Sequence, residues 1–292
     1  MNERLAEAAE SMKGKVARVL SQWLNGVTVT DFELVAETHL SAGHVEEAIR
    51  GIERYLPGYL TPERRILEVG SGFGAFSVFG RAIHNLDITS AEPDPVVRGY
   101  AREFAERAGV ECSFAECAGE NLSFPNGSFD LVFSSNVLEH VKDPAQVLAE
   151  GIRVLKPGGY LFFTYPNYCS FWEGHYGMLW IPCMPKPLAK LYVGLFGRNT
   201  KYIDSLQLVN VGFTRRIIRP LLDRARLISL GDDLWQERMR TLKFGEWGQT
   251  SRLKRALLIL HKIPFLLPIG IALGKLMHWY YPIILVMRKE MD

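Results

Sequence analysis

The chain has few cysteines, little excess charge and no long apolar run, and each shortage excludes a class of protein. The cysteines, Cys112, Cys117, Cys169 and Cys183, lack CxxC spacing. We therefore expect no zinc site and predict unpaired thiols in a reduced, cytosolic compartment. Lys and Arg number 34 against 32 Asp and Glu. This near-neutral balance gives no indication of a nucleic-acid partner.

The apolar segments are too short to cross a membrane. The first 24 residues mix acidic and basic side chains and lack the apolar stretch of a signal peptide, so secretion is not expected. Between residues 256 and 287, Lys262 and Lys275 leave charge-free runs of only 12 residues, whereas a span needs about 20. The basic, apolar stretch 252–280 is expected either to lie on a membrane surface, as a peripheral contact, or to cover the sheet or a dimer contact.

From residue 65 the pattern alternates between strand and helix, which predicts a doubly wound, mostly parallel α/β sheet of seven strands in a Rossmann-like fold. The expected strands are 65–69, 86–91, 110–115, 129–134, 160–165, 225–230 and 281–290, and the expected helices of this core are 75–84, 95–108 and 144–155. A tight turn is expected at residues 156–159, Lys-Pro-Gly-Gly.

Six parts of the chain follow from this pattern. The first is a helical segment, 1–60, with helices over 3–24 and 31–56, the second capped by Asp31. An α/β core, 61–166, precedes an aromatic-rich insertion, 167–213, and a helix and strand, 214–230, with Thr214 as the helix cap. An apolar and basic insertion, 231–280, precedes the last strand, 281–292. We expect the first helices and the aromatic insertion to form the substrate side, since both lie outside the core.

The stretch ILEVGSGFG, residues 66–74, is the strongest candidate for a binding site. It predicts a strand that runs into a turn with glycines at 70, 72 and 74, where a ligand can lie against bare backbone. Glu68 precedes the glycines, and Glu92 ends the next strand, where a carboxylate can accept the hydroxyls of a ribose. An acid so close to the turn opposes a pyrophosphate and favours a positively charged ligand. This and the glycine spacing disfavour a dinucleotide oxidoreductase.

Four segments in this order resemble the class I S-adenosylmethionine-dependent methyltransferases, and the ubiquinone-pathway and other small-molecule branch in particular. They are ILEVGSGFG, SAEPDP, AGENLSFPNGSFDLVFSSNVLEHVKDP and VLKPGGYLFFTYPN, and the resemblance covers about residues 60–166. It implies S-adenosylmethionine as the cofactor. The residues implied to bind it are Glu68, Gly70, Ser71, Gly72, Gly74, Glu92, Pro93, Ala118, Gly119, Glu120, Ser134 and Ser135. Ala118 stands where many relatives have an acid that binds the adenine amino group, so that contact must come from Glu120, from backbone, or be absent.

The segment LEHV, residues 138–141, leaves several interpretations open. In some relatives the equivalent Glu and His, with an acid three residues earlier, bind a divalent cation, and in others they help to hold bicarbonate. Here Asn136 occupies the earlier position, so we predict no metal. Glu139 and His140 can instead order the loop beside the cofactor, or His140 can act as a general base with an unperturbed imidazole.

The predicted function is methyl transfer to a small or lipid-linked acceptor, such as a glycan, a quinone or a polyprenyl compound, at the cytoplasmic membrane surface. The alternative is a catalytically silent scaffold or binding subunit with the same fold. His140, His175 and Tyr165 are the catalytic candidates. The aromatic insertion either lines the acceptor pocket or packs as its own core, and its candidates are Tyr165, Tyr168, Trp172, His175, Tyr176 and Trp180.

Overall fold

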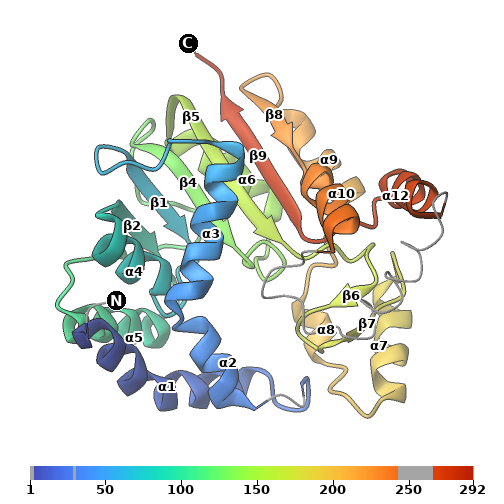
Figure 1. The fold of residues 1–292 in the computed structure, drawn as a ribbon, viewed down its shortest axis with the longest axis horizontal. Coiled ribbons are helices and arrows are strands. Elements are labelled where there is room, and N and C mark those ends of the chain that lie inside the picture. The colour runs from blue at the N-terminus through green and yellow to red at the C-terminus, as the bar shows by residue number, and fades with distance from the viewer. Residues whose placement is uncertain (1–2, 29–30, 243–265, 292) are drawn as a thin grey trace.

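The computed structural model describes residues 3–28, 31–242 and 266–291, and its centre is a seven-stranded sheet (Figure 1). The strands are β1 (Arg65–Val69), β2 (Asp87–Ala91), β3 (Ser113–Ala115), β4 (Phe129–Ser135), β5 (Leu155–Tyr165), β8 (Ala225–Ser229) and β9 (Ile283–Lys289). Their order is β3-β2-β1-β4-β5-β9-β8. Strands β1 to β5 pair in parallel, and β9 runs antiparallel to both β5 and β8. The predicted fold class is confirmed.

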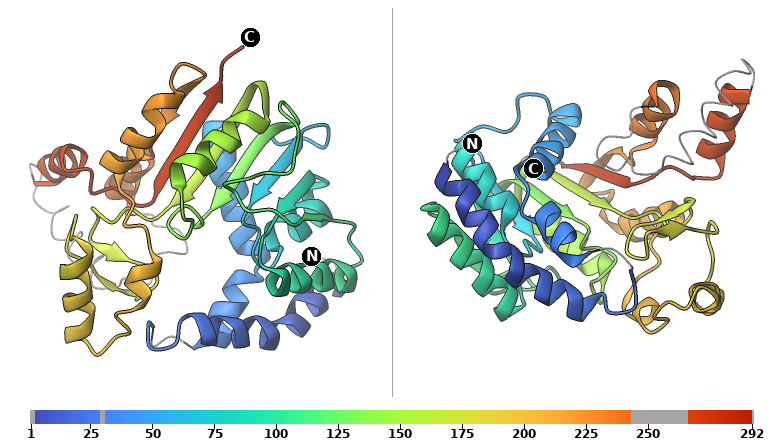
Figure 2. Two further views of the ribbon diagram at one scale, coloured as in Figure 1. Left: turned by 180° about the vertical axis from the view of Figure 1, so that it is seen from behind. Right: turned by 60° about the horizontal axis from the view of Figure 1, so that its bottom comes forward.

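Helices cover both faces of the sheet. On one face lie α1 (Glu3–Trp23), α2 (Phe32–His39), α3 (Ala42–Tyr55), α4 (Ala75–His84) and α5 (Pro95–Ala108); on the other lie α6 (Pro144–Val154) and α9 (Val211–Ile218), followed by the short 3-10 helix Arg219–Leu221. Figure 2 shows α6 and α9 from behind, opposite α3. Alternate strand residues face opposite layers: Ile66 packs with the first group of helices and Leu67 with the second. Each layer therefore has its own apolar core.

Several predicted boundaries are wrong for local reasons. The helix expected over 31–56 is two helices, because Ser41 caps α3 by accepting a hydrogen bond from the Gly43 backbone N–H. Helix α9 begins at Val211 under a cap from Asn210, so Thr214 is a buried residue inside it and not its cap. The expected turn at 156–159 lies within β5, where the pairing with β4 is irregular between Phe129 and Leu131.

The aromatic insertion packs as a small subdomain whose buried residues continue the apolar core on the α6 and α9 side of the sheet. It contains β6 (Trp172–Glu173), β7 (Met178–Leu179), α7 (Lys186–Leu195) and α8 (Tyr202–Ser205). Tyr168, Tyr176 and Trp180 are each at most 2% exposed, so these rings are core residues. Asn167, fully buried, donates hydrogen bonds to the backbone oxygens of His278 and Tyr280. The insertion is thereby joined to the last part of the chain.

The expectation of four unpaired thiols is wrong for two cysteines. Cys169 and Cys183 form a disulfide, whereas Cys112 and Cys117 are free. The two cysteines meet because the insertion folds back on itself, with the Cys183 backbone N–H donating a hydrogen bond to the Tyr168 backbone oxygen. Spacing along the chain does not reveal such an approach. The prediction of a reduced compartment rested on unpaired cysteines, so the disulfide removes its basis.

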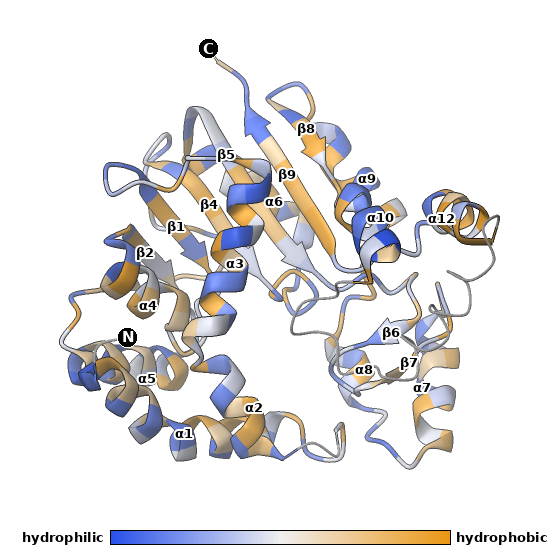
Figure 3. Ribbon diagram, in the orientation of Figure 1, coloured by the Kyte–Doolittle hydropathy of each residue, from blue (hydrophilic) through white to orange (hydrophobic). Residues whose placement is uncertain are grey.

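The second insertion is described in part. It contains α10 (Asp232–Thr241) and α12 (Leu266–Leu276), and the basic stretch 251–263 lies outside the described residues. Figure 3 shows apolar residues along the sheet strands and on α12. Within the described residues, no helix combines the length and apolar character that a membrane span requires.

Candidate functional site

The glycine-rich turn lies at the carboxyl end of β1, between β2 and β4. Gly70 has φ +73°, and a Cβ added there would lie 2.5 Å from Cγ2 of Val137 in the loop after β4. Gly72 also has positive φ, +53°, but an added Cβ would meet no atom within 4 Å. Gly70 therefore permits close packing between two loops, while Gly72 leaves open space above the turn.

Glu92 and Ser71 lie next to Gly72. Glu92, at the end of β2, accepts hydrogen bonds from the backbone N–H groups of Gly72 and Asp94, both at 3.0 Å. Burial raises the pKa of Glu92, although those two backbone donors act against the rise. The hydroxyl oxygen of Ser71 is buried and has no hydrogen-bond partner among the described residues. A ligand with polar groups on this turn would supply that missing partner.

Glu68 lies beneath the turn and not on its open side. Its Oε2 accepts hydrogen bonds from the hydroxyls of Ser77 in α4 and Ser90 in β2, at 2.8 and 2.9 Å. Burial raises the pKa of Glu68 to about 7, opposed by the two serine hydrogen bonds and assisted by the charge of Glu92. The side chain therefore joins the strand to the helix that begins at the turn.

This buried carboxyl group predicts a loss of stability as the pH rises. In the unfolded chain the group ionises near 4.5, but in the folded protein it keeps its proton to about pH 7. Stability is therefore highest below 4.5 and falls by about 3 kcal/mol by the time the folded group has ionised. Glu68→Gln should remove this slope in denaturant unfolding measured across that range. The exposed Glu7→Gln variant serves as the control, and an unchanged slope in Glu68→Gln would refute the assignment.

The other residues predicted for the cofactor lie around the same edge. Gly119 is buried so closely that an added Cβ would lie 2.9 Å from Cγ1 of Val69. Glu120 accepts hydrogen bonds from the backbone N–H groups of Lys142 and Asp143 at 2.9 and 3.4 Å, so its carboxylate is held by the loop before α6. Ser134 donates to the Val69 oxygen at 2.8 Å and joins β4 to β1. Ser135 accepts a hydrogen bond from Thr164 at 3.0 Å.

The first helices contact the turn through Phe73. This ring, 5% exposed, stacks on Trp23 at the end of α1, with 6.1 Å between centroids, and meets His39 of α2 edge-on at the same separation. Burial, with a smaller contribution from His44, lowers the pKa of His39 to about 4, so it is neutral at neutral pH. The first helices therefore cover one side of the turn.

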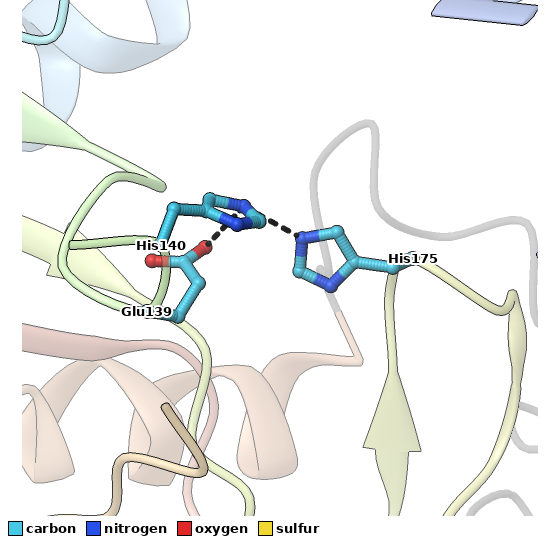
Figure 4. A group of neighbouring side chains, drawn as sticks. All are labelled: Glu139, His140 and His175. Atoms are coloured by element: carbon cyan, nitrogen blue, oxygen red, sulfur yellow. Dashed lines mark hydrogen bonds and ion pairs between the residues drawn. The ribbon is translucent and has the colours of Figure 1, made fainter. Parts of the chain in front are cut away.

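A second cluster unites the two histidines that the sequence proposed separately. His140 lies in the loop after β4, and His175 lies between β6 and β7 in the insertion (Figure 4). Their Nε2 atoms are 3.2 Å apart, and Oε1 of Glu139 is 3.8 Å from His140 Nε2. Desolvation and the neighbouring His175 lower the pKa of His140 to about 3. The expectation of an unperturbed imidazole is therefore wrong, and His140 is a weak base.

Glu173 was missed in the sequence, yet it orients His175. Its Oε1 lies 2.8 Å from His175 Nδ1, and its Oε2 accepts a hydrogen bond from the Tyr176 backbone N–H at 2.6 Å. Desolvation lowers the pKa of His175, but Glu173 and Glu139 outweigh it and the net shift is upward. The two-residue spacing from Glu173 to His175 was the only signal available.

Tyr165 lies apart from the open site as a core residue. Its side chain is fully buried, and its hydroxyl is hydrogen bonded to Thr214 of α9 at 3.0 Å. Burial raises its pKa. Of the two alternatives for this ring, pocket lining and core packing, its full burial and its bond to α9 bear out core packing.

Comparison with known proteins finds a family match for the central part of the chain. Residues 67–163 match the family described as methyltransferase domain. An uncharacterized methyltransferase of Mycolicibacterium gilvum is 37% identical over 124 residues, covering 42% of this chain and 47% of that relative. Another, from Mycobacterium marinum, is 38% identical over 113 residues, covering 38% and 43%. The chain thus spans less than half the length of these curated relatives.

Solved structures with a similar fold cover more of the chain at low identity. Phosphoethanolamine N-methyltransferase 2 of Haemonchus contortus, in complex with phosphomonomethylethanolamine and S-adenosylhomocysteine, has a TM-score of 0.51 at 16% identity and covers 85% of this chain and 53% of its own. The 4+2 cyclase SpnF has a TM-score of 0.53 at 16% identity and covers 97% and 96%. At such identity these likenesses concern the fold alone.

Proposed function

Because residues 67–163 form a methyltransferase domain of the class I, S-adenosylmethionine-dependent type, we propose that the whole protein transfers a methyl group from S-adenosylmethionine to a small or lipid-linked acceptor. One observation carries the cofactor assignment. The space above Gly72 is open, Glu92 accepts a hydrogen bond from the Gly72 backbone N–H, and the buried hydroxyl of the neighbouring Ser71 has no partner among the described residues. A ribose with two hydroxyl donors, attached to a positively charged group, matches an edge with a carboxylate and bare backbone.

Each predicted cofactor residue has a role consistent with its position. Glu92 accepts the ribose hydroxyls, because each of its oxygens, already bonded to one backbone N–H group, can accept a further hydrogen bond. Pro93 follows it and flanks the adenine. Residues 118–120 approach the adenine from the loop after β3, chiefly through backbone, because Glu120 is already held by Lys142 and Asp143. Ser134 and Ser135 end β4 on the sulfonium side.

Glu68 acts from below the turn. Its bonds to Ser77 and Ser90 hold the start of α4 against β1 and β2, so it positions Gly70–Gly74 and does not touch the cofactor directly. Its partial charge near neutral pH still favours a cation above the turn. Glu68, implied by the resemblance to bind the cofactor, therefore acts on it through the loop.

The chain's own contribution to the reaction is placement. When bound, S-adenosylmethionine supplies a methyl group on an already activated sulfonium, so proximity and in-line orientation account for much of the rate. His140, with its low pKa, is a poor acceptor for a proton at neutral pH. His175 and Glu173 are better placed to orient a polar acceptor group beside the loop after β4.

Exposed apolar side chains support a lipid-linked acceptor and a peripheral membrane contact. On α7, Leu188, Leu191 and Leu195 are 47 to 76% exposed, and Ile269, Leu273 and Leu276 on α12 are 46 to 73% exposed. Two helices with outward-facing leucines next to the acceptor side suit a surface that meets acyl or polyprenyl chains. Of the stretch 252–280, the described residues 266–280 belong to this proposed contact.

The deciding experiment incubates the full-length protein with cell extract and methyl-labelled S-adenosylmethionine. Mass spectrometry of the lipid and polar fractions then looks for a labelled species, and we expect one in the lipid fraction together with S-adenosylhomocysteine. A label only in the polar fraction would contradict the lipid-linked acceptor. Binding of S-adenosylmethionine in calorimetry without any labelled product would favour the silent scaffold, and an absence of binding would refute both.

A further inference from the structure

The cluster of Glu139, His140 and His175 combines three side chains from two parts of the chain. Glu139 and His140 follow β4, whereas His175 comes from the turn between β6 and β7 in the insertion (Figure 4). One ligand atom from each residue lies within 4.8 Å of the other two. Asn136 is not part of the cluster, so this arrangement differs from a site built only from the loop after β4.

The Nε2 atoms of the two imidazoles are close enough to share one ion. Two nitrogens bound to one tetrahedral Zn²⁺ at about 2.0–2.1 Å lie about 3.3–3.4 Å apart. The Nε2 atoms of His140 and His175 are 3.2 Å apart. A hydrogen bond between two neutral imidazoles has a similar length. The distance alone therefore does not distinguish a metal site from a hydrogen bond, and a second observation is needed.

The second observation is the buried, unpartnered carboxyl group of Glu139. Its side chain is fully buried, and neither carboxylate oxygen has a hydrogen-bond partner among the described residues. Leaving a buried carboxyl group without partners costs free energy, and such groups usually meet an ion or a donor. The Oε1 atom is 3.8 Å from His140 Nε2, so a small side-chain movement would bring it into the ligand sphere of an ion shared with the imidazoles.

Glu173 supplies the outer support that metal-binding histidines usually have. Its Oε1 lies 2.8 Å from His175 Nδ1, and Glu173 is itself fixed by the Tyr176 backbone N–H. A carboxylate on Nδ1 keeps the proton there and leaves Nε2 as the ligand atom. The side chain of His175 is only 17% exposed, which further restricts its orientation.

We propose that Glu139, His140 and His175 bind a divalent transition-metal ion, with Zn²⁺ as the best match, and join the aromatic insertion to the carboxyl edge of the sheet. Two imidazoles and one carboxylate suit Zn²⁺ and related ions better than Mg²⁺ or Ca²⁺, which prefer oxygen ligands. Three protein ligands leave a fourth position for water or for an oxygen of a bound molecule. His140, 38% exposed, gives solvent access to that position. The inference does not depend on the proposed methyl transfer.

The test uses the full-length protein, stripped with a chelator and titrated with Zn²⁺ in calorimetry. We expect one ion per chain. His175→Ala and Glu139→Gln should each weaken binding more than tenfold, and the positioning variant Glu173→Gln should weaken it by about 10- to 100-fold. His84→Ala removes a histidine that is paired with Glu46 elsewhere on the surface and should leave affinity unchanged. Circular dichroism shows which variants are folded.

Two further readouts keep the result decisive if one variant fails to fold. Co²⁺ bound to the wild-type protein should give the visible absorption of a four- or five-coordinate nitrogen and oxygen site. A thiolate charge-transfer band would place the ion on Cys112 or Cys117 and overturn the proposal. Equal affinity in wild type and either ligand variant would also overturn it, as would displacement of Zn²⁺ by Mg²⁺ at similar concentration.

Discussion

Glu92→Ala is expected to weaken S-adenosylmethionine binding by about 100- to 1000-fold. A carboxylate that accepts two ribose hydroxyls loses two charge-assisted hydrogen bonds, worth about 3–4 kcal/mol together, and about 1.4 kcal/mol corresponds to a factor of ten. The measurement is calorimetric titration of the folded variant with the ligand. Glu92→Gln keeps the shape of the side chain, so its affinity should lie between those of wild type and Glu92→Ala.

The control for this variant is the next carboxylate along the sheet edge. Glu116 follows β3 as Glu92 follows β2, but its side chain is 73% exposed and pairs with Arg98. Glu116→Ala should therefore bind S-adenosylmethionine as the wild type does. Unchanged affinity in Glu92→Ala, or an equal loss in Glu116→Ala, would show that the ribose does not lie against Glu92.

Gly72→Leu should abolish measurable S-adenosylmethionine binding while the protein stays folded. The position has φ +53°, and its Cβ direction leads into open space, so the new side chain would occupy the volume assigned to the cofactor. The backbone strain of a residue with a side chain in this region costs only about 1–2 kcal/mol, which most domains tolerate. Titration calorimetry and thermal unfolding separate the two effects.

Gly58→Leu is the matched control for that strain. Gly58 has φ +67°, and an added Cβ there also meets no atom within 4 Å, but the residue lies on the surface before β1. Both variants should lose similar stability, and only Gly72→Leu should lose the ligand. If Gly72→Leu binds as tightly as Gly58→Leu, the open side of the turn is not the cofactor site.

Local patterns predicted most of the core well. Helices α4 and α5 have the predicted bounds, and β1 does too, because periodic apolar residues, Pro at the start of α5 and glycine turns act within a few residues of one another. The same local logic failed at Ser41 and Asn210. At each of these positions a short polar side chain accepts a hydrogen bond from a backbone N–H, so that a helix begins at a different residue from the predicted one.

The site residues likewise divide into those that local patterns predicted and those whose positions depend on packing. The turn at Gly70–Gly74 and the carboxylate Glu92 were predicted because strand ends meet at one edge of a parallel sheet. The sequence could not show that Glu68 faces Ser77 and Ser90 under the turn, or that α9 covers Tyr165. These outcomes depend on which helix packs on which face.

By itself, then, the sequence determined the strand and helix order, the glycine turn and the carboxylate beside it, since all of these arise from neighbours along the chain. Only the tertiary structure decided that Cys169 meets Cys183 and that His175 comes within 3.2 Å of His140. Both contacts require the insertion to fold back on itself or on the sheet. That packing is set by many weak apolar contacts acting together, and no short motif encodes it.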